Sequence, residues 1–95
     1  MSKHIGAKFD DFLEEEGILA EVEVLAAKRL LAMDIQKAMK ERGFSKSQMA
    51  KRMRTSRAQL DRLLDPENAS VTLATLAKAA TVLGRKLHIS LETAA

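Results

Sequence analysis

The sequence predicts an all-α fold of about five helices, followed by one short β-strand near the C-terminus. Apolar residues recur every three or four positions through most of the 95 residues, which is the period of a helix buried on one side. Ser, Thr and Gly residues stand where such helices would begin and end. One segment, close to the C-terminus, instead alternates apolar and polar residues. A chain this short is one domain near the lower size limit for a self-sufficient core, so help from a partner chain is expected.

The composition excludes several classes of protein. The chain has no cysteine, which removes disulfides and thiolate metal sites. It has no run of about 18 apolar residues and no basic stretch followed by an apolar leader. We therefore expect a cytoplasmic protein without a membrane span or a signal peptide.

The N-terminal region is expected to hold an arm and a short helix. Met1 to Lys8 shows no periodicity and contains Gly6, which is typical of a mobile arm. Phe9, Phe12 and Leu13 then share one helical face, and acidic residues occupy the first turn, where they favour the helix dipole. Gly17 is predicted to end this helix.

The segment from Ile18 to Arg42 contains neither proline nor glycine and predicts one long helix or two helices joined by a kink. At about 1.5 Å per residue it would reach nearly 40 Å, so part of it must project or pack on another chain. Gly43 is predicted to end it, with Lys40 and Arg42 in the last turn. Its apolar positions are Ile18, Val22, Leu25, Ala26, Leu30, Met33, Ile35, Ala38 and Met39.

The centre of the chain predicts two short helices joined by a tight turn. The first begins at Ser45, with Gln48 as its capping-box partner, and runs to about Met53. The second begins at Ser56, with Gln59 as its box partner, and ends before Pro66, since the residue before proline avoids the α region. Two capping boxes at this spacing are a specific signal.

Each of these two helices has an apolar and a polar side. The predicted inner faces are Met49, Ala50 and Met53 in the first helix and Leu60, Leu63 and Leu64 in the second. The outward positions of the second helix are Arg57, Ala58, Gln59, Asp61 and Arg62, which include donors that fit base edges in a major groove. This is the geometry of a helix-turn-helix.

The loop from Asp65 to Ser70 has turn composition, and a further helix follows it. Thr72 is predicted to cap this helix, which runs from Leu73 to Leu83 and is ended by Gly84. Its expected core face consists of Leu73, Leu76, Ala77, Ala80 and Leu83.

Leu87, Ile89 and Leu91 alternate with polar residues, which predicts a strand with one apolar face. Nothing else in the sequence has strand patterning, so its backbone groups need a partner from outside the chain. We expect the same strand of a second copy, which would form a two-stranded ribbon in a homodimer. The alternative is a plain apolar tail packed on the domain.

Charge is distributed unevenly along the chain. Residues 1–27 have a net charge of −5, residues 28–65 of +7 and residues 66–95 of +1. The positive charge thus coincides with the two short helices, which favours phosphate binding over the alternative of solvated helix faces.

The segment from Lys37 to Gly84 resembles the phage-repressor type of helix-turn-helix, the XRE-like family with its lambda-repressor-like bundle. The resemblance is carried by Gln48 and Ala50 in the first helix and by Ser56-Arg57-x-x-Leu60 in the second. Two positions depart from the pattern, since Arg54 stands where the family usually has Gly and Thr55 where it usually has a buried aliphatic residue.

Beyond that core, FDDFLEEEG near the N-terminus and TLATLAKAATVLGRKLHISLE near the C-terminus resemble the small antitoxin-like regulators of the XRE-like family. Members of this subgroup are often encoded beside a ribonuclease-type toxin. The resemblance implies that this chain binds such a toxin and, with it, represses a shared operon. The acidic residues 1–27 have the sign that would attract a basic ribonuclease, but they could equally only support a dimer.

The resemblance also implies which residues contact DNA. The base readers would be Arg57, Ala58, Gln59 and Arg62. Two readings stay open: the arginines can serve as phosphate clamps, and Gln59 can serve only its capping box. Phosphate contacts are expected at helix N-termini and from nearby cations, namely Ser45, Lys46, Ser47, Lys51, Arg52, Arg54, Ser56, Ser70 and Thr72.

No catalytic, metal or cofactor site is predicted. His4 and His88 are far apart in the sequence and lack carboxylate neighbours. The run Glu14 to Glu16 is contiguous, so its side chains would point to different sides of a helix. We expect a protein that is not an enzyme and uses no cofactor.

Together these observations predict three regions: residues 1–29 as an arm and acidic helical extension, 30–84 as the DNA-binding domain, and 85–95 as a dimerisation strand. The predicted function is a homodimeric, sequence-specific repressor that binds a palindromic operator in double-stranded DNA, as the antitoxin of a type II pair. The alternatives are a stand-alone XRE-type regulator with no toxin and a protein-interaction module whose basic surface meets an acidic partner.

Overall fold

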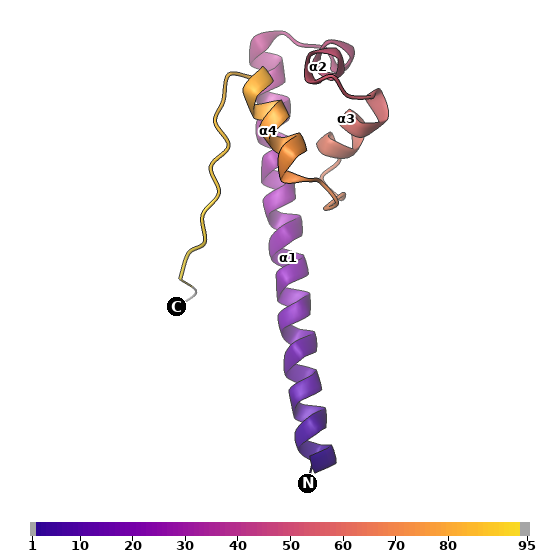
Figure 1. Ribbon diagram of the computed structural model, residues 1–95, viewed down its shortest axis with the longest axis vertical. Helices are drawn as coiled ribbons and strands as arrows, with labels where there is room; N and C mark the ends of the chain where they lie inside the picture. Colours follow the sequence, from indigo (N-terminus) through magenta and orange to yellow (C-terminus); the bar gives the residue numbers. More distant parts are fainter. Residues whose placement is uncertain (1, 94–95) are drawn as a thin grey trace.

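The computed structural model describes the backbone of residues 2–93 and the side chains of residues 16–93. This part of the chain contains four helices, α1 (Ser2–Arg42), α2 (Lys46–Met53), α3 (Arg57–Leu64) and α4 (Leu73–Val82). Figure 1 shows α2, α3 and α4 gathered around the C-terminal part of α1, while the N-terminal part of α1 projects away as a rod. The all-α prediction is confirmed, but the expected count of about five helices was too high by one for the described residues.

The predicted N-terminal arm and the predicted helix end at Gly17 were both wrong, because α1 is continuous over 41 residues. A glycine inside a helix costs only about 0.5–1 kcal/mol relative to alanine, which its neighbours can offset. A glycine ends a helix when it turns left-handed, as Gly43 does with a φ of 67°. Although α1 is long, no helix in the described region combines the length and apolarity that crossing a membrane would require.

The core is formed where α1 meets the three short helices. Ile35, Ala38 and Met39 of α1 are buried there, together with every residue predicted for the inner faces of α2 and α3. Met49, Leu60 and Leu63 are the largest side chains that are completely buried. The predicted inner faces of the two central helices are therefore confirmed. By contrast, Leu30 and Met33 on α1 are about two-thirds exposed, at 64% and 66%.

The predicted core face of α4 was wrong at two of its five positions. Leu73 is 62% exposed and Ala77 is also exposed, whereas Ala79 is completely buried and Val82 is packed against the core. Leu76 and Leu83 are buried as expected. Apolar residues occupy nearly every side of this helix, so the sequence pattern does not define which side faces inward.

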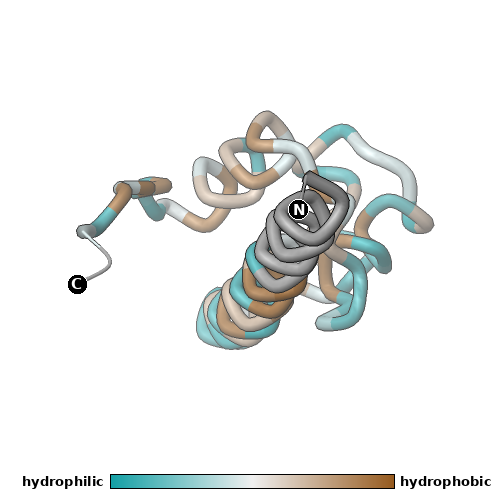
Figure 2. Tube along the Cα trace, turned by 90° about the horizontal axis from the view of Figure 1, so that it is seen from below, coloured by the Kyte–Doolittle hydropathy of each residue, from teal (hydrophilic) through white to brown (hydrophobic). Residues whose placement is uncertain are grey.

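The predicted C-terminal strand does not form in the described chain. Residues 85–93 leave the end of α4 and run in the direction of the N-terminal end of α1, without helix or strand pairing (Figure 1). A strand requires a hydrogen-bonded neighbour, and no other described segment offers one. Leu87 packs against the core, but Ile89 is 59% exposed and Leu91 is fully exposed. Figure 2 shows both hydrophobic and hydrophilic stretches in this segment, which extends away from α1.

Candidate nucleic-acid interface

The turn between α2 and α3 depends on one residue in a left-handed conformation. Arg54 ends α2 with φ 55° and ψ 47°, and its backbone N–H donates to the carbonyls of Ala50 and Lys51. Thr55 then donates its N–H to the Ala50 carbonyl at 3.0 Å. These bonds reverse the chain within three residues, so that the N-terminus of α3 lies beside α2. Glycine is the residue expected at such a position, because it has no Cβ to clash.

The helix N-termini are capped largely as predicted. Ser45 Oγ accepts from the Gln48 N–H at 3.1 Å, and Gln48 Oε1 accepts from the Ser45 N–H at 2.9 Å, which completes the first capping box. Ser56 Oγ accepts from the Gln59 N–H at 3.1 Å. The Gln59 side chain, however, accepts a hydrogen bond from the Thr55 hydroxyl. The second capping box is therefore only half formed, since Thr55 competes for the glutamine oxygen.

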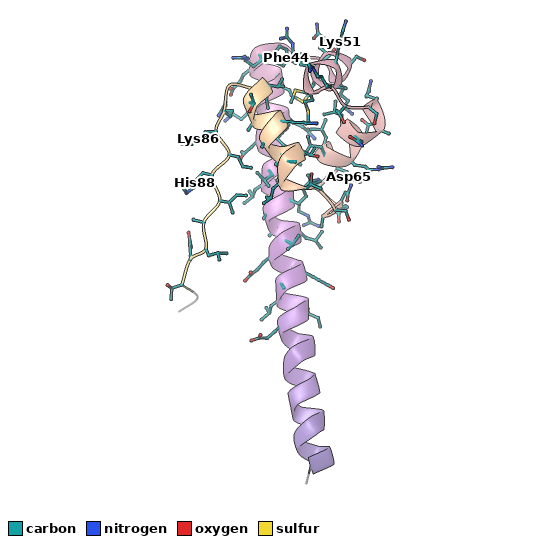
Figure 3. The ribbon with its side chains drawn as sticks, in the orientation of Figure 1. Phe44, Lys51, Asp65, Lys86 and His88 are labelled. Atoms are coloured by element: carbon teal, nitrogen blue, oxygen red, sulfur yellow. The ribbon has the colours of Figure 1, made fainter. Side chains whose placement is uncertain are left out.

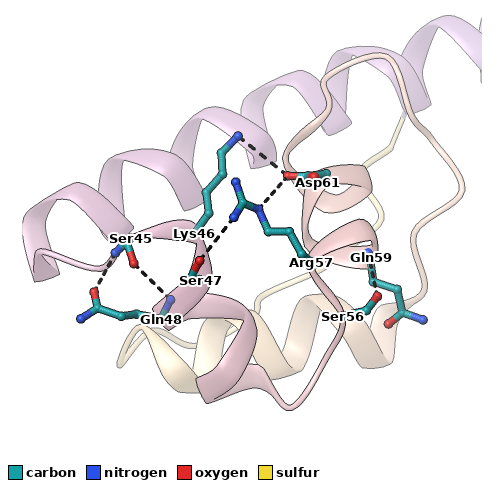
Figure 4. A network of polar contacts seen from close by, with 8 residues as sticks. All are labelled: Ser45, Lys46, Ser47, Gln48, Ser56, Arg57, Gln59 and Asp61. Carbon is teal, nitrogen blue, oxygen red and sulfur yellow. Dashed lines mark hydrogen bonds and ion pairs between the residues drawn. The ribbon is translucent and has the colours of Figure 1, made fainter.

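Arg57 extends from α3 towards α2 and is held between the two helices (Figure 4). Its Nε lies 3.4 Å from Asp61 Oδ1, and its Nη1 donates to Ser47 Oγ at 3.3 Å. Lys46 Nζ lies 3.8 Å from the same Asp61 oxygen. Because these side chains are about half exposed, the ion pairs add little to stability. They do fix the direction of the Arg57 guanidinium at the surface.

A second group of predicted contacts lies around the other side of α3. Gln59 and Arg62 border a shallow groove of about 160 Å³, whose far wall is formed by Ser70, Thr72 and Thr75. Thr72 caps α4 by accepting from the Thr75 N–H at 3.2 Å. The structure thus brings two base-reading candidates together with two phosphate candidates, while Arg57 lies with Lys46 and Ser47. Ala58 is exposed on α3, between the two groups in sequence.

The remaining predicted phosphate contacts, Lys51, Arg52 and Arg54, are all exposed. Arg52 is held over the ring of Phe44, with 4.4 Å from its guanidinium carbon to the ring centroid, and Arg42 lies 5.7 Å from the same centroid. Such cation–π contacts orient an arginine without neutralising its charge. Figure 3 shows Phe44 and Lys51 at the end of the helical body away from the rod, and Asp65 nearer to it.

The sequence did not reveal a lysine that contacts the C-terminal end of α3. Lys28 of α1 is only 4% exposed, and its Nζ donates to the carbonyls of Arg62 at 3.1 Å and Asp65 at 2.6 Å. On α1, Lys28 lies on the same helical face as the buried Ala32 and Ile35. That placement at a core position was the signal available in the sequence.

The environment of Lys28 changes its acidity. Burial lowers the pKa of the Lys28 ammonium below its usual value of 10.5, and the nearby Asp65 carboxylate opposes part of that shift. The ammonium remains paired with oxygen atoms, since no buried side-chain nitrogen or oxygen in the described residues is without a hydrogen-bond partner.

Within residues 16–93, no group of His, Asp and Glu side chains is arranged to hold a metal ion. His88 is exposed, and the side chain of His4 lies outside the described part. The side chains of Glu14 and Glu15 also lie outside it.

Comparison with known proteins agrees with this geometry. A family profile described as a helix-turn-helix domain matches residues 9–92. No curated protein and no solved structure gave a match. The match covers α2, the turn at Arg54, α3, the flanking helices and most of the C-terminal segment. With these two helices packed at a tight turn over a shared core, the chain belongs to this helix-turn-helix domain family.

Proposed function

We propose that this protein is a sequence-specific repressor that reads double-stranded DNA through α3, acts as a homodimer on a palindromic operator, and serves as the antitoxin of a type II pair. It needs neither catalysis nor a cofactor for this role. The observation that carries the DNA-reading part is the exposed face of α3. Arg57, Gln59 and Arg62 occupy that face, while the opposite face is buried in the core.

The surroundings of α3 support a phosphate-binding role. Lys46 in the first turn of α2 approaches Asp61 of α3 at 3.8 Å, and Thr72, which caps α4, lines the groove bordered by Gln59 and Arg62. Helix N-termini of this kind attract anions. Residues 28–65 have a net charge of +7. Positive charge of this kind supplies affinity for any duplex, whereas the side chains on α3 would supply sequence preference.

The DNA-reading role is tested by three single substitutions. A bidentate contact from arginine to guanine is worth about 1–3 kcal/mol of discrimination. We expect Arg57→Ala and Arg62→Ala to lose affinity on a duplex selected from a random library by the wild-type chain, and to keep it on a shuffled duplex. Lys46→Ala should weaken both duplexes alike. If the arginine variants lose equal affinity on both duplexes, they are phosphate clamps.

The same titrations separate DNA binding from the protein-interaction alternative. A DNA-binding protein should lose affinity steeply as salt rises, because bound phosphates release counterions. If the chain binds no duplex at low salt, the result favours the alternative in which its basic surface binds an acidic protein.

Homodimer formation is supported by the C-terminal segment. Ile89 and Leu91 expose apolar side chains, and the backbone of residues 85–93 has no strand partner within the described chain. Pairing with the same segment of a second copy would bury both features. A dimer of this kind would place two α3 helices on half-sites about one helical turn, roughly 34 Å, apart.

The antitoxin role is supported by the projecting part of α1. Its apolar residues Ile18, Leu19, Val22 and Val24 are between 49% and 61% exposed and lie in an acidic region with net charge −5 over residues 1–27. Such a surface fits a basic partner, with charge speeding the encounter and apolar contact supplying the affinity. Phe9, Phe12 and Leu13 are further candidates, but their side chains lie outside the described part.

Co-expression with the product of the neighbouring gene tests the antitoxin role. That gene alone should arrest growth, and the full chain should restore it. A chain beginning at Ala26 should fail to restore growth, while it keeps Lys28 and hence the contacts with α3. Rescue by this shortened chain would indicate that the toxin binds a part of the protein other than residues 1–25. A harmless neighbouring gene product would instead indicate a stand-alone regulator.

A further inference from the structure

The C-terminus of α3 is held by side chains from α1. Lys28 donates to the carbonyls of Arg62 and Asp65, and Gln36 Nε2 donates to the carbonyl of Leu64 at 3.2 Å. We call Lys28 and Gln36 the α3 clamp. The three acceptors lie at the end of α3 and at its C-cap, where helix carbonyls are short of partners. The Arg62 carbonyl also accepts from the Asp65 N–H at 3.3 Å and from Asn68 Nδ2 at 3.4 Å.

We propose that the α3 clamp positions the recognition helix, so that Lys28 and Gln36 contribute to DNA sequence discrimination although neither lies on the reading face. This inference rests on the proposed DNA-reading function of α3. The clamp residues act through α3 and are therefore positioning residues.

The geometry of α3 explains why such a device is needed. With eight residues, α3 is too short to be stable alone, so its orientation depends on what holds it. Its N-terminus is fixed by Ser56 and by the turn at Arg54. Its C-terminus has no glycine cap and leads directly into the loop that begins at Asp65. Leu63 and Leu64 pack this end on the core, and the α3 clamp adds directional hydrogen bonds to it. Together with the attachment at the N-terminus, these bonds define the direction of the helix axis.

One residue links the clamp directly to the reading face. The carbonyl of Arg62 accepts from Lys28, while the Arg62 side chain lines the groove beside Gln59. A shift of this backbone would move the Arg62 guanidinium by a similar distance. Hydrogen bonds to base edges tolerate only small displacements, since they weaken steeply with distance and angle.

The chemistry of the clamp also favours a positioning role over simple packing. Burying an ammonium group is costly, and an apolar side chain of similar size would fill the same space without that cost. The ammonium, however, carries three donors and a positive charge, which suits the partial negative charge at a helix C-terminus. Beside it, Arg29 Nη2 lies 3.1 Å from Glu67 Oε1, which ties the following loop to α1 as well.

The test compares Lys28→Met, Gln36→Ala and Lys28→Arg in the full chain with Lys78→Met, which removes an exposed lysine from α4, as control. The probes are the duplex that the wild-type chain selects from a random library and a shuffled duplex of the same composition. We expect Lys28→Met to lose about tenfold in the affinity ratio between the two duplexes, equivalent to about 1.4 kcal/mol. The loss should fall on the selected duplex alone, because Lys28 is buried and its ammonium faces backbone carbonyls.

Amide hydrogen exchange in the free protein gives a second readout. The Asp65 N–H donates to the Arg62 carbonyl at 3.3 Å, so its exchange should accelerate about tenfold in Lys28→Met, while amides in α2 keep their wild-type rates. General destabilisation would instead accelerate amides in all the helices. Lys28→Arg keeps the charge and the donors and should restore at least half of the discrimination.

Three results would overturn the positioning role. One is a folded Lys28→Met whose affinity ratio stays within twofold of wild type, and another is unchanged exchange at Asp65. If Lys28→Met does not fold, Gln36→Ala provides the test, because Gln36 is exposed and its truncation spares the core. The third overturning result is an affinity ratio in Gln36→Ala that equals that of wild type. If the wild-type chain itself selects no duplex, the proposed function fails, and the inference fails with it.

Discussion

Arg54 shows how a single residue shapes the DNA-binding element. Its left-handed backbone conformation creates the turn between α2 and α3, yet arginine gains nothing from that conformation and bears the clash of its Cβ. The side chain, in return, adds a positive charge beside the reading helix. At this position stability and phosphate affinity are therefore opposed.

We predict that Arg54→Gly stabilises the protein and weakens its binding to every duplex. Relief of the left-handed strain outweighs the greater flexibility of glycine in the unfolded chain, for a net gain of about 0.5–1 kcal/mol. Thermal unfolding should show a melting temperature higher by several degrees. Arg54→Ala is the control, since it removes the same charge but keeps the strain. A melting temperature that does not rise in Arg54→Gly would contradict this prediction.

Lys28 should make the unfolding free energy of the protein depend on pH in the alkaline range. Because burial lowers its pKa in the folded state below 10.5, the unfolded chain binds more protons in the window between the lowered value and 10.5. The unfolding free energy contributed by this group must then rise with pH through that window. Urea unfolding of wild type and Lys28→Met across this range should show a difference that moves in favour of wild type as pH rises. A difference that is flat or moves the other way would contradict the shift.

At the scale of elements, local signals predicted most of the helix ends after residue 42 and the end of α1 at Gly43. Ser45, Ser56, Thr72, Gly43 and Gly84 act as the sequence indicated, because a cap depends on residues three or four positions away. The contacts of Lys28 could not be predicted in this way. Its acceptors are backbone carbonyls 34 and 37 positions along the chain, and a carbonyl has no signature in the sequence.

Apart from the helix end at Gly17, where the neighbouring residues continue α1, the predictions that failed concern elements whose orientation or pairing depends on other parts of the molecule. The inward side of α4 is decided by packing, since Leu73 and Ala77 are as apolar as the residues that are buried. The C-terminal strand needs a partner that the single chain does not hold. The base-reading and phosphate roles stay predictions, because the structure places these residues without a nucleic acid.

Gly17, inside α1, and Gly43, just after its last residue, should respond oppositely to the same substitution. Gly17 is exposed, has open space where a Cβ would lie and has no positive φ, so Gly17→Ala should raise helicity and stabilise the helix locally by about 0.5–1 kcal/mol. Gly43 also has open space but a φ of 67°, so Gly43→Ala should cost about 1 kcal/mol. Circular dichroism and thermal unfolding measure both effects. A loss of helicity in Gly17→Ala would argue that α1 breaks at this residue.

The whole molecule is much more extended than its length requires. Its radius of gyration is 17.9 Å, whereas a compact chain of this length is expected near 12 Å. The rod of α1 and the C-terminal segment account for the excess, and both carry exposed apolar residues. These are the two surfaces to which we assign a toxin and a second copy of the chain.

We predict that Ile89→Asp dissociates the homodimer without unfolding the chain. Ile89 is 59% exposed in the single chain, so a charge there costs little until a partner buries it, when the cost becomes several kcal/mol. Sedimentation should show a monomer, with loss of tight binding to a palindromic duplex. Ser90→Asp adds the same charge on the other side of the segment and should remain dimeric. An Ile89→Asp protein that sediments as a dimer and still binds would exclude the ribbon.

Because α1 is one continuous helix, a small rotation at its contact with α3 becomes a large displacement at its N-terminal end. Ser2 and Lys28 are 26 positions apart on one helix, which corresponds to about 40 Å. If the helix moves as a rigid body about its contact with α3, a rotation of about 5° at Lys28 displaces the far end by about 3 Å, a small-angle estimate from that helix length. A label near the N-terminus would therefore magnify movements of α3 too small to detect at the DNA surface itself. The same geometry works in the opposite direction. A molecule that binds the projecting N-terminal part of α1 acts far from the contact with α3, so a small force there can rotate α3.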